Sequence, residues 1–129
     1  MNRKSGKILI VDDDLDILQA ARLFLKQHVA FVDAVESPEM IPRFLRNESL
    51  DVILLDMNFA RGETSGREGF EWLDRIHKLD PSVVVIMITA FGDIELAVKA
   101  IKEGATDFIL KPWQNEKLLA TVSSALSLR

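Results

Sequence analysis

Cysteine is absent from this chain of 129 residues, so disulfide bonds and thiolate metal ligands are excluded, as fits a reducing compartment. An excess of basic residues is also missing: 16 Lys and Arg stand against 20 Asp and Glu, for a net charge of −4. That balance argues against direct binding of nucleic acid, which favours a basic surface. Low-complexity segments, internal repeats and linker-like stretches are absent too, so we expect one domain over residues 1–129.

Long hydrophobic runs are lacking as well. The apolar run nearest the N-terminus, Ile8 to Val11, is too short for a signal-peptide core or a membrane span. What is present is a globular composition, with 48% hydrophobic and 28% charged residues. We therefore expect a soluble, cytoplasmic protein without a membrane partner.

Five short β-type runs alternate with helical patterns along the chain. Several of these runs are almost continuously apolar, as parallel strands buried on both faces should be. The predicted strands are Lys7–Val11, Phe31–Val35, Asp51–Leu55, Val83–Thr89 and Asp107–Leu110. Alternating strands and helices predict an α/β fold, a (βα)5 three-layer sandwich around a parallel sheet.

The helices are predicted from apolar positions at helical spacing and from capping residues. The first carries a stripe of Leu15, Leu18, Ala21 and Leu25, with Asp14 as the simplest N-cap, and the second starts at Ser37-Pro38. The others cover about 69–79, 93–103 and 115–128, the fourth capped by Asp93, ended by Gly104 and turning Ile94, Ala97, Val98 and Ile101 inward.

Polar residues stand where four of the predicted strands end. Because ligands of such folds bind at the carboxyl ends of the strands, we expect these residues to form one cluster. They are Asp12, Asp13 and Asp14 after the first strand, Asp56 after the third, Thr89 after the fourth and Lys111 after the fifth.

The chemistry of this set favours phosphoryl transfer. Clustered carboxylates repel one another, and oxygen ligands without His or Cys favour a hard cation, Mg²⁺ in a cell. Lys111 and Thr89 add donors that suit an anion. Asp56, on the expected central strand, is the candidate nucleophile, since carboxylates can form aspartyl phosphates. Each of these residues alone would more simply be a turn former or a cap, and only their conjunction favours a site.

Four segments carry a resemblance to a known family. The sequence resembles receiver domains of two-component response regulators over about residues 7–127, which implies the CheY-like strand order 2-1-3-4-5. The matching segments are "ILIVDDD", "DVILLD", "VVVIMITA" and "GATDFILKPW". The stretch from Thr89 to Trp113 is most similar to receivers of NtrC type, which normally precede an ATPase domain and a DNA-binding domain.

The resemblance implies a role for each site residue. Asp56 would be the phosphoacceptor, Asp13 a direct Mg²⁺ ligand and Asp12 a ligand acting largely through water. The remaining implied roles are a metal-ligating backbone carbonyl at Asn58, a switch hydroxyl at Thr89, a phosphoryl-pairing lysine at Lys111, an aromatic switch at Phe108 and a cis bond between Lys111 and Pro112.

The implied function is a signalling switch and not an enzyme with a separate substrate. A sensor histidine kinase or phosphotransfer protein would donate to Asp56. The face made by helix 4, strand 5 and helix 5 would then change, permitting a homodimer and controlling an output, transcription in NtrC-like members. Two alternatives stay open. An aspartyl-nucleophile phosphatase would carry an acid where Asn58 stands, and a phosphorylation-independent interaction module would typically have lost site residues that this chain keeps.

The region after Asp56 departs from the family pattern. Ala60 replaces the usual proline, and residues 61–68 lengthen the loop, which we expect to be mobile. Phe91, two residues after Thr89, stands at a position that gates water in the family. We hypothesise that its apolar bulk slows self-dephosphorylation. His28 and His77 are expected at the surface and away from the site.

Overall fold

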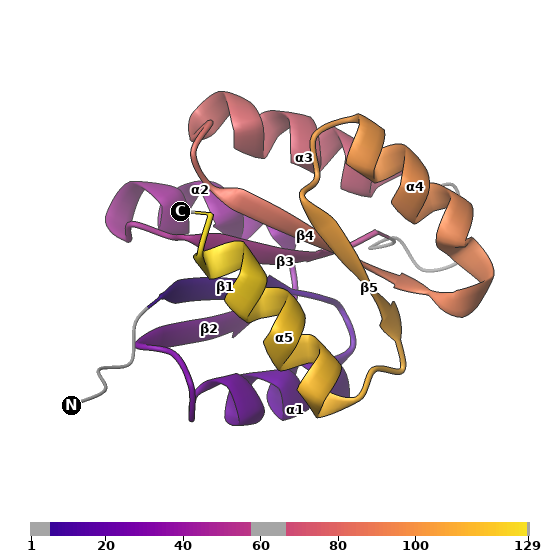
Figure 1. Cartoon of the computed structure of the whole chain (residues 1–129). Coiled ribbons are helices and arrows are strands. Elements are labelled where there is room, and N and C mark those ends of the chain that lie inside the picture. The colour runs from indigo at the N-terminus through magenta and orange to yellow at the C-terminus, as the bar shows by residue number, and fades with distance from the viewer. Residues whose placement is uncertain (1–5, 58–66, 129) are drawn as a thin grey trace.

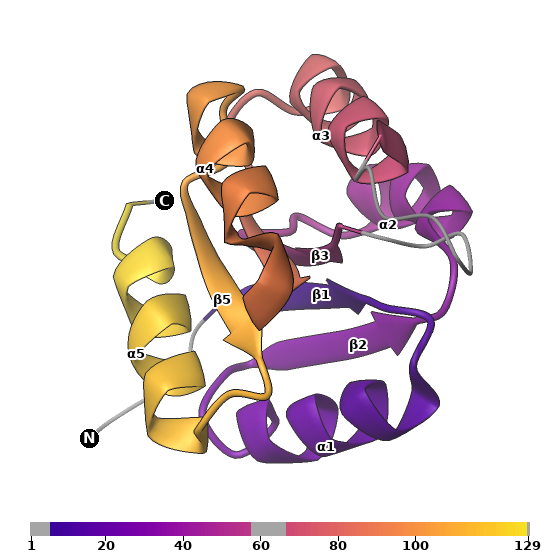
Figure 2. The ribbon, with the colours of Figure 1, turned by 90° about the vertical axis from the view of Figure 1, so that its right-hand side faces the viewer.

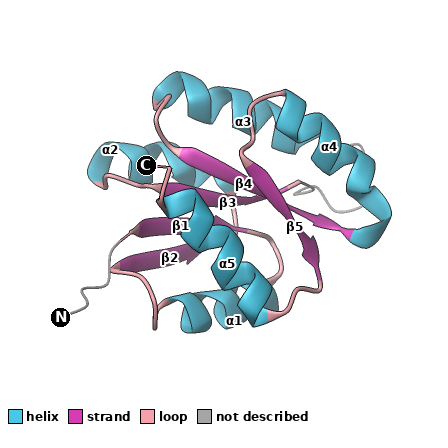
Figure 3. Cartoon of the chain, viewed as in Figure 1, coloured by secondary structure: helices cyan, strands magenta, loops and turns pink. Residues whose placement is uncertain are grey.

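The computed structural model describes residues 6–57 and 67–128 of the chain. Strands and helices alternate throughout, as Figure 3 shows. The elements are β1 (Lys7–Val11), α1 (Leu15–Leu25), β2 (Phe31–Val35), η1 (Pro38–Met40), α2 (Ile41–Asn47), β3 (Val52–Asp56), α3 (Arg67–Leu79), β4 (Val84–Ala90), η2 (Phe91–Asp93), α4 (Ile94–Lys102), β5 (Asp107–Lys111) and α5 (Asn115–Leu126). All five predicted strands are present, each displaced by one residue or less at its ends.

The five strands form one parallel sheet with β3 at its centre. Their order is β2-β1-β3-β4-β5, which confirms the expected order (Figure 1). All of β3 and four of the five residues of β1 are buried. This burial explains why these strands read as nearly unbroken apolar runs: helices cover both of their faces.

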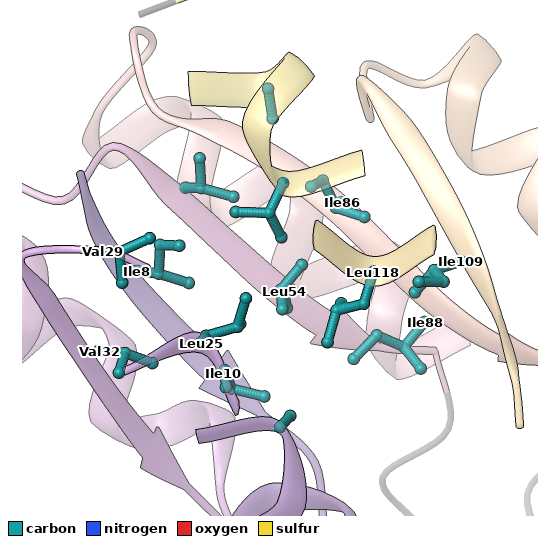
Figure 4. Packing of buried hydrophobic residues seen from close by; sticks show 14 of the residues in the cluster. Ile8, Ile10, Leu25, Val29, Val32, Leu54, Ile86, Ile88, Ile109 and Leu118 are labelled. Atoms are coloured by element: carbon teal, nitrogen blue, oxygen red, sulfur yellow. The ribbon is translucent and has the colours of Figure 1, made fainter. Parts of the chain in front are cut away.

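Two hydrophobic cores lie on the two faces of the sheet. The first joins the sheet to α1 and α5, and Figure 4 shows Ile10, Leu54 and Ile86 of the strands together with Leu25 and Leu118 of these helices. The second core lies under α2, α3 and α4, which cover the opposite face (Figure 2). The sandwich predicted from the sequence is thereby confirmed.

Several helix ends follow from local sequence. Asp14 is the N-cap of α1, and its carboxylate accepts hydrogen bonds from the backbone N–H groups of Asp16 at 3.0 Å and Ile17 at 3.3 Å. Gly104 follows α4 with φ of +115°, a left-handed conformation that glycine adopts without strain. Asp93 also stands at an N-cap position, but its side chain accepts no capping hydrogen bond in the described part of the chain, contrary to expectation.

The predicted inward face of α4 is wrong in three of its four residues. Ile94 is 46% exposed, Val98 49% and Ile101 39%, whereas Ala97 and Ala100 are fully buried. The two alanines face the sheet because small side chains let a helix lie close to it, and this places the larger apolar residues outside. Leu15, expected on the buried stripe of α1, is likewise 60% exposed, since it lies in the first turn of that helix.

The start of α3 also differs from expectation. The helix begins at Arg67 and not at Gly69, so Arg67 and Glu68 are helical and do not belong to a loop. The expected mobility of residues 61–66 lies outside the described residues. Of the two histidines, His28 is exposed and His77 is partly buried.

An aspartate in each edge strand binds its own main chain. In β2, the N–H of Ala34 donates to Asp33 Oδ1 at 2.8 Å. In β5, at the other edge, the N–H of Phe108 donates to Asp107 Oδ1, also at 2.8 Å. Both free edges of the sheet thus carry the same local hydrogen bond.

None of the helices in residues 6–57 and 67–128 combines the length and the apolar character that crossing a bilayer requires.

Candidate functional site

Three carboxylates meet at the carboxyl edge of the sheet. Asp12 follows β1, Asp13 is next to it, and Asp56 is the last residue of β3; one oxygen of each lies within 4.8 Å of the others. Asp12 and Asp56 are buried, while Asp13 is exposed. The expected convergence of these residues is confirmed, because β1 and β3 are neighbouring parallel strands that end side by side.

Lys111 reaches this acidic cluster from the end of β5. Its Nζ lies 2.7 Å from Asp12 Oδ2 and 3.6 Å from Asp56 Oδ1. The shorter contact is an ion pair with a fully buried carboxylate. The expected cis peptide bond between Lys111 and Pro112 is present.

The charge of Lys111 is stabilised by its surroundings. Burial by itself would lower the pKa of the amine, because the charged form loses hydration. The contact with Asp12, followed by the charges of Asp56 and Asp13, outweighs this effect and raises the pKa of Lys111 above its ordinary value. The lysine is therefore positively charged at neutral pH and partly offsets the acidic cluster.

The orientation of Asp12 is fixed from two sides. Its Oδ1 accepts a hydrogen bond from the backbone N–H of Asp14 at 2.9 Å, and its Oδ2 faces Lys111. Asp14 itself caps α1, so the function predicted for it as a cap is confirmed. The turn from β1 into α1 thus aims one acid into the site and uses the other for the helix.

Thr89 brings an unsatisfied hydroxyl to the same edge. The residue is 1% exposed, and its Oγ1 has no hydrogen-bond partner among the described residues. It follows Ile88, which is paired with Asp56 across β3 and β4. Because a buried polar atom without a partner is costly, this hydroxyl is suited to an incoming acceptor.

Phe108 and Thr89 share one face of the sheet. Phe108 is paired with Met87, and Thr89 lies two residues further along β4. Side chains two residues apart in a strand point to the same side, so both residues face the layer that contains α4. Phe108 is partly buried and packs against the core beneath that layer.

The residues present fit a hard divalent cation. Their donors are carboxylate oxygens, which Mg²⁺ prefers, and two of the three acids are buried, where an added positive charge would offset their repulsion. With Lys111 in contact with two of them and the Thr89 hydroxyl at the same edge of the sheet, the acids could hold a cation and a phosphoryl group together.

A groove of about 710 Å³ lies away from these residues, between α1 and residues 33–40. Two sequence predictions fall outside the described residues, namely the Asn58 carbonyl ligand and the side chain of Phe91. The ion pair between Lys111 and Asp12 is not predicted from the sequence. It depends on the distance between the ends of β1 and β5, which only the structure gives.

A five-stranded parallel sheet of order 2-1-3-4-5, with acids and a lysine at its carboxyl edge, defines a receiver-type fold and site. The family model for the response regulator receiver domain matches residues 8–123, and the chain belongs to this family. Within this family it is similar to receivers of NtrC type, such as those of ZraR, DctD and NtrX.

Individual relatives support this assignment. The chain is 33% identical to the transcriptional regulatory protein ZraR of Klebsiella oxytoca, with 98% of this chain and 28% of ZraR covered. The receiver domain of a Bacteroides fragilis response regulator is 44% identical with a TM-score of 0.86, covering 95% and 98% of the two chains. NtrX of Brucella abortus is 30% identical with a TM-score of 0.85, covering 95% and 27%. The chain thus spans only about a quarter of the length of ZraR and NtrX.

Proposed function

We propose that residues 1–129 form a single phosphoacceptor receiver domain, in which Asp56 takes a phosphoryl group from a sensor histidine kinase or a phosphotransfer protein. The observation that carries this proposal is the meeting of Asp12, Asp13 and Asp56 within 4.8 Å, with Lys111 in contact with two of them. Burial of two acids beside one lysine costs solvation free energy, which favours a functional role for the cluster over a purely structural one.

The chain's own residues support the transfer step. A carboxylate oxygen of Asp56 attacks the phosphorus of a phosphohistidine, an O–P bond forms, and the N–P bond to the imidazole breaks. Lys111, already 3.6 Å from Asp56, neutralises charge on the transferred oxygens. Thr89, whose hydroxyl lacks a partner in the described residues, donates to one of them.

A bound Mg²⁺ would supply further neutralisation of the phosphoryl charge. We assign it to Asp12, Asp13 and Asp56, together with the backbone carbonyl of Asn58. The chemistry of the three carboxylates supports this assignment. Turnover of external substrates is not part of the proposal, since the domain acts on its own aspartate.

The conformational response begins at Thr89 and continues at Phe108. When the Thr89 hydroxyl moves to meet the phosphoryl group, Phe108 enters the space beside it on the same face of the sheet. This shift alters the surface of α4, β5 and α5. The exposed apolar residues Ile94, Val98 and Ile101 make that surface suitable for a homodimer. Because relatives such as ZraR are transcriptional regulators, transcription is the proposed output.

Labelling with acetyl phosphate tests the proposal directly. The wild-type domain should be labelled in the presence of Mg²⁺, and the label should disappear in Asp56→Asn and on addition of EDTA. Beryllofluoride with Mg²⁺ should shift the NMR signals of residues 89–113. Absence of label together with unchanged spectra would favour a phosphorylation-independent module, and sustained hydrolysis of phosphomonoesters would favour a phosphatase.

A further inference from the structure

Gly69, in the first turn of α3, touches the backbone that leaves the acidic site. A Cβ placed on Gly69 would lie 2.8 Å from the carbonyl oxygen of Met57 and 3.0 Å from its Cα. The first distance is about 0.6 Å shorter than ordinary van der Waals contact at 3.4 Å. The φ angle of Gly69 is not in the left-handed region, so close approach, and not backbone conformation, requires glycine here.

The same Met57 peptide is held from the opposite side by β4. The N–H of Met57 donates to the carbonyl oxygen of Ile88 at 2.9 Å. The Met57 side chain is fully buried in the core under α3. Met57 is therefore held between the end of β4 and the start of α3.

This placement ties together the two functional strand ends. Met57 directly follows Asp56, and Ile88 directly precedes Thr89. A displacement of the Met57 backbone would move Asp56 relative to Thr89 and to the other acids. We infer that Gly69 is a positioning residue: by letting α3 press on the Met57 carbonyl, it sets the position of the Asp56 carboxylate. This inference rests on the proposed function, since it concerns the same metal and phosphoryl site.

Substitution of Gly69 by alanine distinguishes the contact with Met57 from the general effect of a glycine on helix stability. Alanine is the better helix former, so intrinsic propensity predicts that Gly69→Ala stabilises α3. The contact with Met57 predicts the opposite, because a backbone carbonyl cannot swing aside as the end of a side chain can. Mutation of a residue that orients metal ligands typically lowers the affinity for the metal 10–100-fold.

The experiment compares three glycine-to-alanine variants with the wild-type domain. Gly92→Ala serves as the neutral control, since a Cβ there meets nothing within 4 Å. Gly104→Ala serves as the destabilised control, because its φ of +115° strains alanine and its Cβ would meet the His77 ring at 2.7 Å. Gly104 precedes β5, whereas the site lies where β5 ends. This control therefore lies at the amino ends of the strands, away from the site.

Two quantities are measured: the Mg²⁺ dissociation constant, from the NMR shifts of the Thr89 and Lys111 amides, and the hydrogen-exchange rate of the Met57 amide. We expect Gly69→Ala to weaken Mg²⁺ binding roughly tenfold and to speed exchange at Met57. Both control variants should bind Mg²⁺ within about twofold of wild type, although Gly104→Ala unfolds at lower temperature.

Three results would overturn the inference. One is an Mg²⁺ affinity of Gly69→Ala within twofold of wild type. Another is an equal loss of affinity in Gly104→Ala, which would make instability the cause. The third is failure of the wild-type domain itself to bind Mg²⁺ at these amides, which would overturn the proposed function as well.

If Gly69→Ala is partly unfolded, trimethylamine N-oxide is added to restore the folded population. The Mg²⁺ titration is then repeated and judged by the same criterion.

Discussion

The helices α3 and α4 cover the same face of the sheet in different ways. In α3 the buried side chains are large: Trp72, Leu73 and Ile76 enter the core. In α4 only the alanines Ala97 and Ala100 are buried. Of the larger apolar residues of α4, Ile94, Val98 and Ile101 remain at the surface, and Leu96 is partly buried against the core.

The difference shows that a helix can lie close to the sheet without being held there by large buried side chains. Burial of a Leu or Ile side chain contributes about 1.5–3 kcal/mol, and an alanine far less. α3 is therefore held by its side chains, while α4 lies close to β4 and β5 with little apolar area to hold it. A helix of the second kind is easier to displace than α3, as the proposed response of α4 requires, whereas α3 provides the firmer support beside Met57.

The largest expected effect comes from shortening an anchor of α3. Ile76→Ala should lower the free energy of unfolding by about 2–5 kcal/mol, because the fully buried side chain leaves a cavity. Urea denaturation measures the change. Lys78→Ala, at an exposed position two residues on, is the control and should stay within about 0.5 kcal/mol of wild type. A loss below about 1 kcal/mol in Ile76→Ala would show that α3 is not anchored there.

The next effect comes from enlarging a contact of α4. Ala100→Leu should destabilise the fold by about 1–3 kcal/mol, since no room exists between the helix and the sheet for a larger side chain. Ala120→Leu, at an exposed position of α5, is the matched control and should be nearly neutral. Equal stability of both variants in urea would mean that α4 moves away from the sheet without penalty.

The start of α4 should be less sensitive than the start of α1. Asp14→Ala removes two capping hydrogen bonds and should cost about 1 kcal/mol. Asp93→Ala removes no capping hydrogen bond in the described structure and should lower the free energy of unfolding by no more than about 0.3 kcal/mol. Thermal unfolding of the two variants at one pH makes the comparison, and an equal loss in both would mean that Asp93 caps α4 in solution.

The smallest effect is expected at the outer face of α4. Val98→Ala should change the free energy of unfolding by less than about 0.5 kcal/mol, because the side chain is half exposed. The same change at the buried Val85 should cost clearly more. If Val98→Ala also weakens self-association of the beryllofluoride-treated domain in sedimentation, the exposed stripe is a contact surface. A large loss of stability would instead mean that α4 is anchored through Val98.

Sequence reasoning succeeded where the signal is local or follows from topology. The strand ends at Asp12, Asp56 and Lys111 were placed together because parallel strands end at one edge, and Asp14 and Gly104 carry their own capping signals. The orientation of α4 was not predicted correctly, because its pattern contains two apolar faces and periodicity cannot tell which one packs. The contact of Gly69 with Met57 was also missed. It depends on how closely α3 approaches β3, a distance that no residue pattern encodes.

The aspartates of the two edge strands have a consequence for aggregation. An exposed edge strand is a template on which another chain can add by main-chain pairing. Asp33 and Asp107 each occupy an N–H of their own strand and place a carboxylate beside it, so an incoming strand meets a missing donor and a negative charge. The sheet is thereby discouraged from growing into a fibre-like stack at either side. The proposed association through the exposed apolar residues of α4 would therefore compete with less main-chain pairing at the edges of the sheet.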